Sequence, residues 1–419
     1  MTSESSTIGN QRIVFVCSAD FSAPSEKVAL GFSLELVRRG ARILLLINGD
    51  PASIDLELGE DRPPGLEVHD YGFRFGRLDP DTKELVRRFD PTIVHAYNPR
   101  LPVVTAVRGL IDERTPVVVN FEDDEWGLMR LHSGPWPRLP LRVAGRIGGP
   151  IHPAAWPYAT AGTLKWARDR GDVFHAITPE LAREVEQVMR RQCEILLPVH
   201  PGLGPGDHGG GVVPLPDSIG DRPLVTFTGA IYGAQADDFR LLLEAMGRLV
   251  ERGSDAVLVF AGSAAGRFDL RAWAAESGVP DDRFVMTGYL NFRDMWALLG
   301  RSDVLVQPGA PTEFNRLRLP SKLQAYLSSG TPTVTFGAGA GELFEDGTEV
   351  LKTFTAHPAE LADAIQRILD EPELRAKLAE GGPRAAERLF GLARNTDRLV
   401  EIYEKALEGA KHAHGPRAV

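Results

Sequence analysis

Short apolar runs alternate with longer segments of helical character along most of this chain, and this alternation restricts the fold more than any other feature. The runs at residues 12–17 and 43–47 are predicted strands, and residues 25–39 between them are a predicted helix that ends at Gly40. A strand, a helix and a second strand make a right-handed parallel crossover. Further strands are expected at residues 67–71, 93–96, 117–121 and 171–178, and further helices at 82–89, 103–111 and 179–191. The first half is therefore predicted to be a doubly wound α/β sheet.

The same alternation begins again near residue 224 and predicts a second α/β sheet. Strands are expected at residues 224–228, 256–261, 284–287, 304–307 and 333–336. Helices are expected at residues 237–252, 270–277, 292–299, 358–371, 372–390 and 396–411.

The segment between the two alternations, residues 198–223, is too rich in glycine and proline to continue a helix or a strand. A chain of 419 residues also exceeds one ordinary hydrophobic core. We therefore expect two domains, at residues 1–200 and 224–392, with a linker at 201–223 and a terminal segment at 393–419. Two α/β domains of this kind predict a ligand in a cleft that faces the carboxyl ends of their strands.

Composition excludes several classes of protein. Hydrophobic residues at 43% and charged residues at 25% are typical of a globular protein, and a net charge of −10 disfavours nucleic-acid binding. Two cysteines, Cys17 and Cys193, provide neither a disulfide framework nor a metal-ligand spacing. The polar N-terminus and the lack of an apolar run of about 18 residues predict a cytoplasmic protein without a transmembrane segment.

Residues 126–170 interrupt the alternation with seven cations, four tryptophans and a single acid, Asp169. Basic and aromatic side chains together suit contact with an anionic partner or with a membrane surface. The alternative is a surface excursion whose arginine stems lie along apolar surface. Peripheral membrane contact therefore stays open.

Three cations lie beside a predicted helix start within residues 308–342. Arg316 and Arg318 precede Pro320, Lys322 follows it, and Gly330 suits the exit of the helix. A helix N-terminus offers free N–H groups and a positive dipole end, so these cations predict a pocket for an anion such as a diphosphate. The alternative is that they are solvated loop cations.

Several motifs in this region resemble the nucleotide-binding end of retaining GT-B glycosyltransferases of family 4. They are PSKL at residues 320–323, GTPTV at 330–334, GAGE at 339–342 and DG at 346–347. The resemblance extends more weakly over nearly the whole chain. It implies two Rossmann-like domains that face a cleft, with the acceptor in residues 1–200, the nucleotide sugar in residues 224–392, and a C-terminal helix in 393–419 that returns to the first domain.

The same resemblance implies a function. The protein is expected to move a sugar, with retention, from a nucleoside-diphosphate sugar to a small-molecule or glycan acceptor, without a metal or a cofactor. Gly229, in the loop after the strand at residues 224–228, would let the backbone approach a phosphate. The family usually adds an arginine and a lysine in this loop, but no cation precedes Arg240 here. Arg318 and Lys322, with Arg316, are expected to stabilise the leaving diphosphate instead.

The expected nucleotide and sugar contacts depart further from the family. Gly288, Tyr289 and Leu290 match the loop whose backbone meets the nucleobase, although Tyr289 equally suits a packed aromatic. The family's two glutamates, the later of which holds the ribose hydroxyls, fall on Leu317 and Ala325. A thymidine donor, which lacks one ribose hydroxyl, would tolerate that loss.

Four polar positions are the remaining donor candidates. Glu313 and Gln324 are expected to hydrogen-bond the sugar in place of the missing glutamates. Gly341 and Glu342 are either donor-sugar or phosphate contacts, or parts of a structural turn.

The first half carries four consecutive acids, residues 122–125, directly after a predicted strand. Glu122 stands where the family places a histidine near the reacting carbon. Glu122 and Asp123 would accept or orient the proton of the acceptor, bind a cationic acceptor such as an amino sugar, or form a solvated helix start. A metal site is disfavoured because adjacent acids alternate in direction. His95 ends the fourth strand, where it is either a catalytic group or a core histidine.

These departures leave two rival interpretations open. A nucleotide-sugar epimerase can share this fold. A non-catalytic binding subunit would account for the missing glutamates and histidine. The sequence predicts no oligomeric state.

Overall fold

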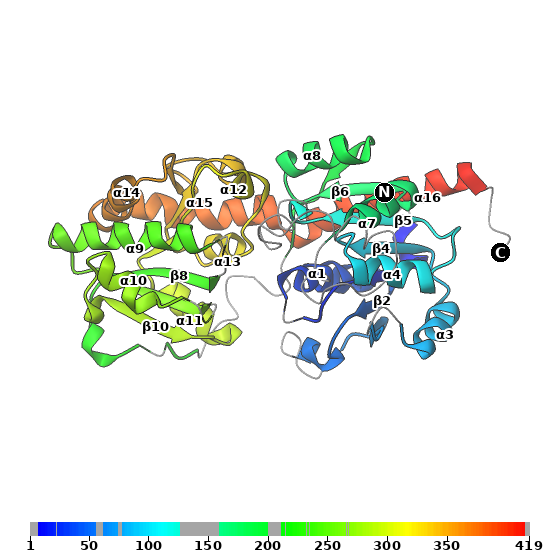
Figure 1. Ribbon diagram of the computed structural model, residues 1–419, viewed down its shortest axis with the longest axis horizontal. Coiled ribbons are helices and arrows are strands. Elements are labelled where there is room, and N and C mark those ends of the chain that lie inside the picture. Colours follow the sequence, from blue (N-terminus) through cyan, green and yellow to red (C-terminus); the bar gives the residue numbers. More distant parts are fainter. Residues whose placement is uncertain are drawn as a thin grey trace, which may run out of the picture. The chain divides into compact units, whose positions relative to one another are not determined.

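The computed structural model describes residues 7–21, 23–55, 62–73, 78–125, 159–199, 211–213, 215–231, 233, 235–264, 266 and 268–414. Packing divides the chain into two compact units (Figure 1). Unit 1 comprises residues 1–202 and 390–419, and unit 2 comprises residues 203–389.

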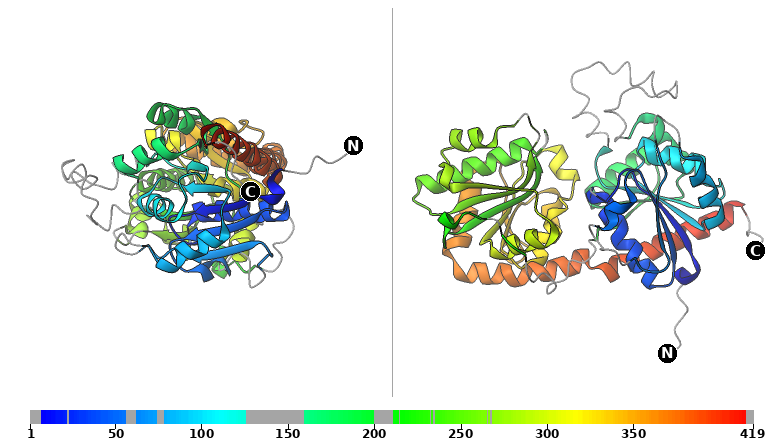
Figure 2. Two further views of the ribbon diagram at one scale, coloured as in Figure 1. Left: turned by 90° about the vertical axis from the view of Figure 1, so that its right-hand side faces the viewer. Right: turned by 90° about the horizontal axis from the view of Figure 1, so that it is seen from below.

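Unit 1 is built on a seven-stranded parallel sheet in the order β3-β2-β1-β4-β5-β6-β7. Its strands are β1 (Arg12–Val16), β2 (Arg42–Ile47), β3 (Leu66–Asp70), β4 (Ile93–Tyr97), β5 (Val117–Phe121), β6 (Val173–Ala176) and β7 (Cys193–Ile195). Its helices are α1 (Pro24–Arg38), α3 (Pro80–Phe89), α4 (Leu101–Leu110), α7 (Ala161–Arg170), α8 (Pro179–Met189) and α16 (Leu392–His414). Helices lie on both faces of the sheet, so β4 and β5 are buried along their whole length (Figure 2).

Unit 2 is built on a six-stranded parallel sheet in the order β10-β9-β8-β11-β12-β13. Its strands are β8 (Leu224–Ile231), β9 (Val257–Ala264), β10 (Phe284–Gly288), β11 (Val304–Gln307), β12 (Thr333–Phe336) and β13 (Leu351–Thr353). Its helices are α9 (Ala236–Glu251), α10 (Leu270–Glu276), α11 (Phe292–Arg301), α12 (Glu313–Leu317), α13 (Lys322–Ser328), α14 (Pro358–Asp370) and α15 (Pro372–Phe390). The fold prediction of two parallel Rossmann-like sheets is confirmed.

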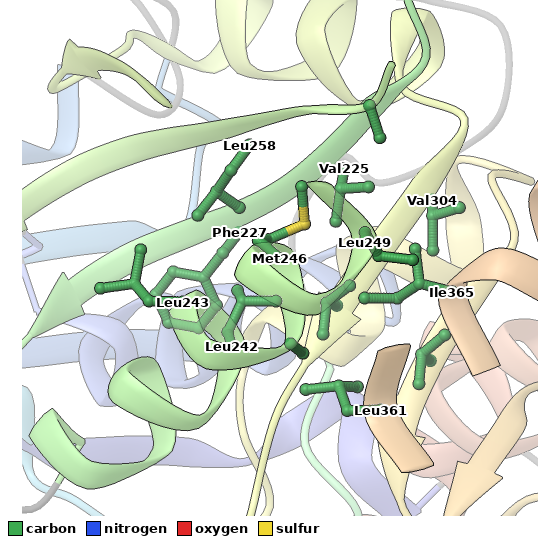
Figure 3. Packing of buried hydrophobic residues seen from close by; sticks show 14 of the residues in the cluster. Val225, Phe227, Leu242, Leu243, Met246, Leu249, Leu258, Val304, Leu361 and Ile365 are labelled. Atoms are coloured by element: carbon green, nitrogen blue, oxygen red, sulfur yellow. The ribbon is translucent and has the colours of Figure 1, made fainter. Parts of the chain in front are cut away.

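The core of unit 2 lies where α9 and α14 pack against each other and against the sheet. Leu242 and Met246 of α9 are fully buried against Val225 of β8 and against Leu361 and Ile365 of α14 (Figure 3). The helical spacing of the α9 residues puts them on one face, which is the amphipathic pattern that predicted this helix.

Helix α16 packs on unit 1, as the predicted return of the C-terminal helix requires. Leu399, Ile402 and Tyr403 are completely buried in the core of the first sheet. At the surface, Arg39, which directly follows α1, lies 2.5 Å from Asp397 of α16. Burial of apolar area therefore holds the end of the chain in unit 1, and exposed ion pairs add little.

The structure describes only part of the basic and aromatic segment, because residues 126–158 lie outside the described ranges. Its remainder forms α7, in which the Trp166 side chain is buried and Lys165 pairs with Asp169. Arg170 donates to the backbone carbonyl of Thr115 at 2.6 Å. In this part the tryptophan packs in the core and the cations form contacts within the protein, which fits the alternative of a surface excursion. Contact with an anionic partner or a membrane surface stays a prediction. No helix in the described ranges is both long enough and apolar enough to cross a membrane.

Two histidines and a tyrosine form a buried polar cluster between the sheet of unit 1 and α16. The Nδ1 atom of His95 lies 2.9 Å from the Tyr403 hydroxyl, and its Nε2 lies 2.8 Å from Nε2 of His175. Because only one proton fits between two facing nitrogens, the two rings cannot both be protonated. Burial lowers the pKa of His95 below its usual range and that of His175 to about 3, and the neighbouring His175 lowers the pKa of His95 further.

These two pKa values predict that unit 1 loses stability in acid. Below about pH 6.5, the two histidines bind protons in the unfolded chain but stay neutral in the folded one. Their contribution to folding stability is therefore fully present above that pH and falls as the pH drops. Between about pH 6.5 and its own lowered pKa, each histidine reduces the free energy of unfolding by about 1.4 kcal/mol per pH unit. Chemical denaturation between pH 6.5 and 4.5 should show a smaller acid slope for His175→Gln than for the wild type. The exposed His357→Gln is the control, and an equal slope in all three proteins would contradict the prediction.

Candidate functional site

The carboxyl-terminal half of β8 and the segment that follows β11 meet at one point of unit 2. Neighbouring strands β8 and β11 stand where the strand order of the sheet reverses. In open α/β sheets, ligands bind outside the carboxyl ends of the strands at such a reversal. The end of β8, the start of α9, α12 and the start of α13 all contribute residues there. Because β8 extends to Ile231, Gly229 lies in the strand and not in the predicted loop after residue 228.

Lys322, the first residue of α13, lies against β8. Its Nζ atom is 3.7 Å from the centre of the Phe227 ring. A Cβ atom at Gly229, whose φ is +115°, would lie only 3.3 Å from the same Nζ. Burial and the positive charge of Arg318 lower the pKa of Lys322 well below its usual range. The structure thus brings together Gly229, Lys322 and Arg318, three of the predicted phosphate contacts.

Arg318 is held by a buried acid that the sequence did not reveal. Its side chain is 13% exposed, and its Nη2 atom lies 3.3 Å from Oδ2 of Asp238. The guanidinium also lies over the Phe314 ring, 4.6 Å from its centre. Asn315 Nδ2 donates to both carboxylate oxygens of Asp238, at 3.1 and 3.3 Å. Burial raises the pKa of the Asp238 carboxyl, although Arg318 and Asn315 oppose this shift.

A pattern in α9 would have identified Asp238. The acid is followed at helical spacing by Leu242, Ala245 and Leu249, which are all completely buried, so it lies on the core face of the helix. Charged side chains in such positions are almost always paired. Acids are common in the first turn of a helix because the helix dipole favours them there. Asp238 therefore did not stand out in the sequence as a residue of the site.

Arg316 belongs to a different part of the site. It is exposed and lines a cavity of about 370 Å³ together with Glu313, Phe336 and Ala338. Arg318 lines the smaller cavity next to it instead. The predicted trio of cations is therefore divided, with Arg318 and Lys322 in one place and Arg316 in another.

Helix α13 is shorter than expected. It spans only Lys322–Ser328, and Ser321 before it makes no side-chain cap. Gly330 ends the turn after it with a φ of +74°, as predicted. So short a helix adds little dipole, and anion binding there depends on the cationic side chains. The Tyr326 hydroxyl accepts a 2.8 Å hydrogen bond from the backbone N–H of Thr228 and thereby fixes α13 to β8.

The predicted nucleobase loop is exposed at the end of β10. Gly288 has a φ of +73°, and Tyr289 is 83% exposed. The packed-aromatic interpretation of Tyr289 is therefore wrong, and its ring is open to stacking. Leu290 instead packs partly into a small apolar cluster of unit 2.

Glu313 and Gln324, the proposed substitutes for the missing glutamates, differ in their exposure to solvent. Glu313 is exposed at the 370 Å³ cavity, whereas Gln324 is only 3% exposed. Ala325 is also buried, in an apolar cluster with Tyr326. The placement of Gln324 in the interior argues against its predicted contact with the sugar.

The turn at residues 339–343 has a strong structural requirement for glycine. A Cβ atom at Gly341 would lie 1.9 Å from the Phe336 carbonyl oxygen, and Gly339 has a φ of +59°. Glu342 is exposed. Gly341 is therefore required by the geometry of the turn, as the structural interpretation predicted. Glu342, by contrast, is accessible to a ligand.

The acids of unit 1 lie at the carboxyl end of its sheet and are mostly buried. Glu122 is 8% exposed, and its side chain and backbone form hydrogen bonds with Asn98 at 3.4 and 3.0 Å. Burial raises the pKa of Glu122 to about 7, with contributions of opposite sign from its neighbours Ser25 and Glu26. Its burial shows that Glu122 is not part of a solvated helix start.

The other acids of this group have separate partners. Glu125 is buried and lies 2.7 Å from Arg100. Asp123 is 35% exposed and lies 3.7 Å from the same arginine. Glu26, which the sequence did not reveal, accepts hydrogen bonds from the backbone N–H groups of Ser18 and Ala19. The Glu26 carboxylate therefore already accepts hydrogen bonds from the backbone amides of the loop that follows β1.

His95 has no exposed surface, because the rings of Phe15 and Tyr97 and the polar cluster enclose it. The core interpretation fits this placement. His95 is therefore not among the catalytic groups proposed below.

Residues 222–371, which cover most of unit 2, match the family model described as Glycosyl transferases group 1. An alpha-D-kanosaminyltransferase from Streptomyces kanamyceticus is 28% identical over 188 residues, which are 45% of this chain and 47% of that protein. A 2-deoxystreptamine glucosyltransferase from the same organism is 31% identical over 189 residues, or 44% and 46% of the two chains. The match therefore spans about half the length of these relatives.

Solved structures align over nearly the whole chain. The Anabaena protein HepE, solved with UDP and glucose, aligns with a TM-score of 0.65 at 15% identity, over 94% of this chain and 100% of that one. Sucrose-phosphate synthase from Thermosynechococcus elongatus aligns with a TM-score of 0.63 at 12% identity, over 94% and 99%. A putative UDP-N-acetylglucosamine 2-epimerase from Listeria monocytogenes gives 0.57 at 14%, over 98% of both chains. At these identities the likeness shows the fold, and it confirms the predicted GT-B architecture.

The hydrogen bond between Tyr326 and Thr228 predicts a measurable loss of stability. Tyr326→Phe leaves the buried Thr228 N–H without its acceptor, which should cost about 1–3 kcal/mol of unfolding free energy. Denaturant unfolding measures this loss. Tyr289→Phe removes an exposed hydroxyl and is the matched control. Equal stability of the two variants would show that the hydrogen bond does not hold α13.

Proposed function

We propose that the protein is a glycosyltransferase that moves a sugar from a nucleoside-diphosphate sugar to a small-molecule or glycan acceptor. One observation carries the proposal. Lys322 and Arg318 converge with Gly229 at the strand-order reversal of a sheet whose sequence matches a glycosyltransferase model. The HepE structure, which was solved in complex with UDP and glucose, supports a nucleotide-sugar donor.

The electrostatics of this cluster suit a departing diphosphate. The leaving group gains negative charge as the glycosidic bond breaks, and fixed cations in a poorly hydrated place stabilise that charge strongly. In the free protein, the ammonium form of Lys322 is disfavoured by burial and by Arg318. A bound diphosphate would stabilise the ammonium form, since a nearby anion raises the pKa of a lysine.

The finer features of the proposal are those of family 4 enzymes. The reaction retains the anomeric configuration and uses neither a metal nor a cofactor, because Arg318 and Lys322 supply the positive charge. The donor phosphate itself takes the proton of the acceptor, so positioning supplies much of the rate. We place the activity in the cytoplasm, where a reducing environment suits the free cysteines Cys17 and Cys193.

The acceptor end of the proposal rests on Glu122 and Asp123. A carboxyl group whose pKa is about 7 is ionised above neutral pH, and it can then accept a hydrogen bond from the acceptor hydroxyl and orient it. The same carboxylates suit an acceptor that carries a protonated amine. The name of one relative, 2-deoxystreptamine glucosyltransferase, supports that choice of acceptor.

A nucleotide-sugar epimerase is the second candidate, because a putative UDP-N-acetylglucosamine 2-epimerase shares the fold over 98% of the chain. Incubation of the protein with a sugar nucleotide and no acceptor separates the two functions. An epimerase converts the sugar, whereas a transferase leaves it unchanged apart from slow hydrolysis.

Removal of either cation should abolish transfer while the fold remains intact. Arg318→Ala and Lys322→Ala are each expected to lower kcat/KM roughly 100-fold or more, as for the loss of one fixed group that stabilises charge in a transition state. Arg384→Ala and Lys377→Ala, at exposed positions of α15, are the matched controls. Steady-state kinetics and circular dichroism measure the two effects. Near-normal rates in both site variants would contradict the diphosphate site.

The donor nucleotide is identified by thermal shift with UDP, GDP, TDP and ADP. A ligand at about 100 times its dissociation constant adds roughly 2.7 kcal/mol to stability. One nucleotide should stabilise the wild type and fail to stabilise Lys322→Ala. If no nucleotide stabilises the wild type, a non-catalytic binding subunit accounts for the chain better.

The raised pKa of Glu122 predicts a pH dependence of transfer. If its ionised form orients the hydroxyl of the acceptor or binds its amine, kcat/KM for the acceptor rises as the pH passes upward through about 7. Glu122→Gln should abolish this rise and leave nucleotide affinity unchanged. An identical pH profile in the variant would remove Glu122 from the mechanism.

A further inference from the structure

Asn98 has an unusual backbone conformation for a residue that directly follows a strand, here β4. Its φ is +59°, in the left-handed region that residues other than glycine rarely adopt. In the described ranges, Asp90 and Arg190 are the other non-glycine residues with a positive φ. Those two residues cap the C-terminal ends of α3 and α8, where this conformation is common. Asn98 ends no helix, so its conformation has another cause.

The Asn98 side chain is completely buried and contacts Glu122 twice. Its Oδ1 atom accepts a 3.0 Å hydrogen bond from the Glu122 backbone N–H, and its Nδ2 atom donates to Oε2 of Glu122 at 3.4 Å. Rotation of the amide by half a turn would set two donors against each other, so the amide has one orientation. Backbone strain of this kind persists where surrounding contacts fix it, and the two contacts with Glu122 are such contacts.

The turn after β4 holds the run of acids at residues 122–125 by both of its ends. The Arg100 backbone N–H donates to the Asn98 carbonyl oxygen at 2.8 Å, and the Arg100 guanidinium lies 2.7 Å from Glu125. Asn98 holds Glu122 at the other end of the run. Because β4 and β5 are paired neighbours, the end of one strand thus fixes the acid that follows the other.

Asn98 is neutral, whereas most of the charged groups around Glu122 are acids. Burial raises the pKa of Glu122, Glu26 and Asp123 raise it further, and Arg100 lowers it. The titratable groups near Glu122 come from several elements of unit 1, and they are Cys17, Glu26, Tyr97, Arg100 and Asp123. An amide suits this place because it holds the carboxylate by a hydrogen bond and adds no further negative charge.

We propose that Asn98 is a positioning residue, which fixes the backbone and the carboxylate of Glu122 for contact with the acceptor. The inference rests on the proposed function, because it affects transfer only if Glu122 orients the hydroxyl of the acceptor or binds its amine. Such a step is sensitive to geometry, since a misplacement of about 1 Å costs about 100-fold in rate. Asn98 acts through Glu122 and not by its own contact with the acceptor.

Replacement of Asn98 by glycine tests this role. Asn98→Gly removes both contacts and keeps the left-handed backbone, which glycine adopts freely. It is expected to lower kcat/KM for the acceptor roughly 10- to 100-fold and to leave the Kd of the donor nucleotide unchanged. Arg190→Gly, at an exposed residue with the same backbone conformation, is the matched control and should change neither quantity. A normal kcat/KM in Asn98→Gly overturns the positioning role.

Combination with Glu122→Ala separates positioning from a general structural role. If Asn98 acts through Glu122, Asn98→Gly should lower kcat/KM no further once residue 122 is alanine. An equal loss in both backgrounds overturns the positioning role and leaves the proposed function in place. Normal transfer by Glu122→Ala alone removes the acceptor role of Glu122 from the proposed function, and the positioning role falls with it.

Asn98→Asp covers the case in which the glycine variant does not fold. Aspartate tolerates the left-handed conformation and keeps an acceptor for the Glu122 N–H, but it places a second carboxyl group beside Glu122. Because a nearby like charge raises the pKa of a carboxyl group, kcat/KM for the acceptor should rise at a higher pH than in the wild type. The same pH profile in both proteins overturns the side-chain contact.

A crystal structure of Asn98→Gly decides the positioning of Glu122 without an activity assay. A displaced Glu122 side chain supports the role, and a side chain that keeps its wild-type place overturns it. If the wild type transfers no sugar, the proposed function fails, and this structure still shows whether Asn98 holds Glu122.

Discussion

The ion pair between Arg318 and Asp238 is the contact on which the candidate site depends. Two cations, Arg318 and Lys322, lie close together at the reversal of the sheet in unit 2, where burial disfavours charge. Asp238, with Asn315 beside it, balances only one of them. The unbalanced lysine has a lowered pKa, and an anion is the ligand that would restore its charge. In the proposed function, a diphosphate supplies that anion.

The scaffold around this pair is rigid for identifiable reasons. Gly229 permits the close approach of Lys322 to β8, and the Tyr326 hydroxyl ties α13 to the same strand. Because α13 has only seven residues, side chains and not a helix dipole carry the positive charge. Unit 1 has the opposite character, since buried carboxylates, among them Glu26 and Glu122, gather at the carboxyl end of its sheet. The two sheets have the same architecture but offer opposite charge to a ligand.

Much of the fold was predictable because buried parallel strands are continuous apolar runs. The predicted bounds of β5, β11 and β12 coincide with those of the structure. The sequence did not reveal β7 and β13, which have three residues each and are too short to show a period. It also did not reveal α7, because its arginines and tryptophans suggested a surface before their partners were known.

The candidate site was predictable only where a residue type acts through its own chemistry. Arg318 and Lys322 were proposed because cations beside a predicted helix start suit an anion, and Gly229 because a glycine lets the backbone approach a phosphate. Asp238 was not, because its partner lies 80 residues away and only the fold brings them together. His95 shows the converse case. Its place in a familiar motif suggested catalysis, but the packing of α16 puts it in the core.

Proton uptake on nucleotide binding tests the central claim most directly. Isothermal titration calorimetry in buffers of different ionisation enthalpy, from pH 7 to pH 9, counts the protons that accompany the binding of a nucleoside diphosphate. If Lys322 receives the diphosphate, its lowered pKa rises on binding, and the wild type takes up a fraction of one proton that Lys322→Met does not. Binding with the same affinity and the same proton count in both proteins would contradict the account.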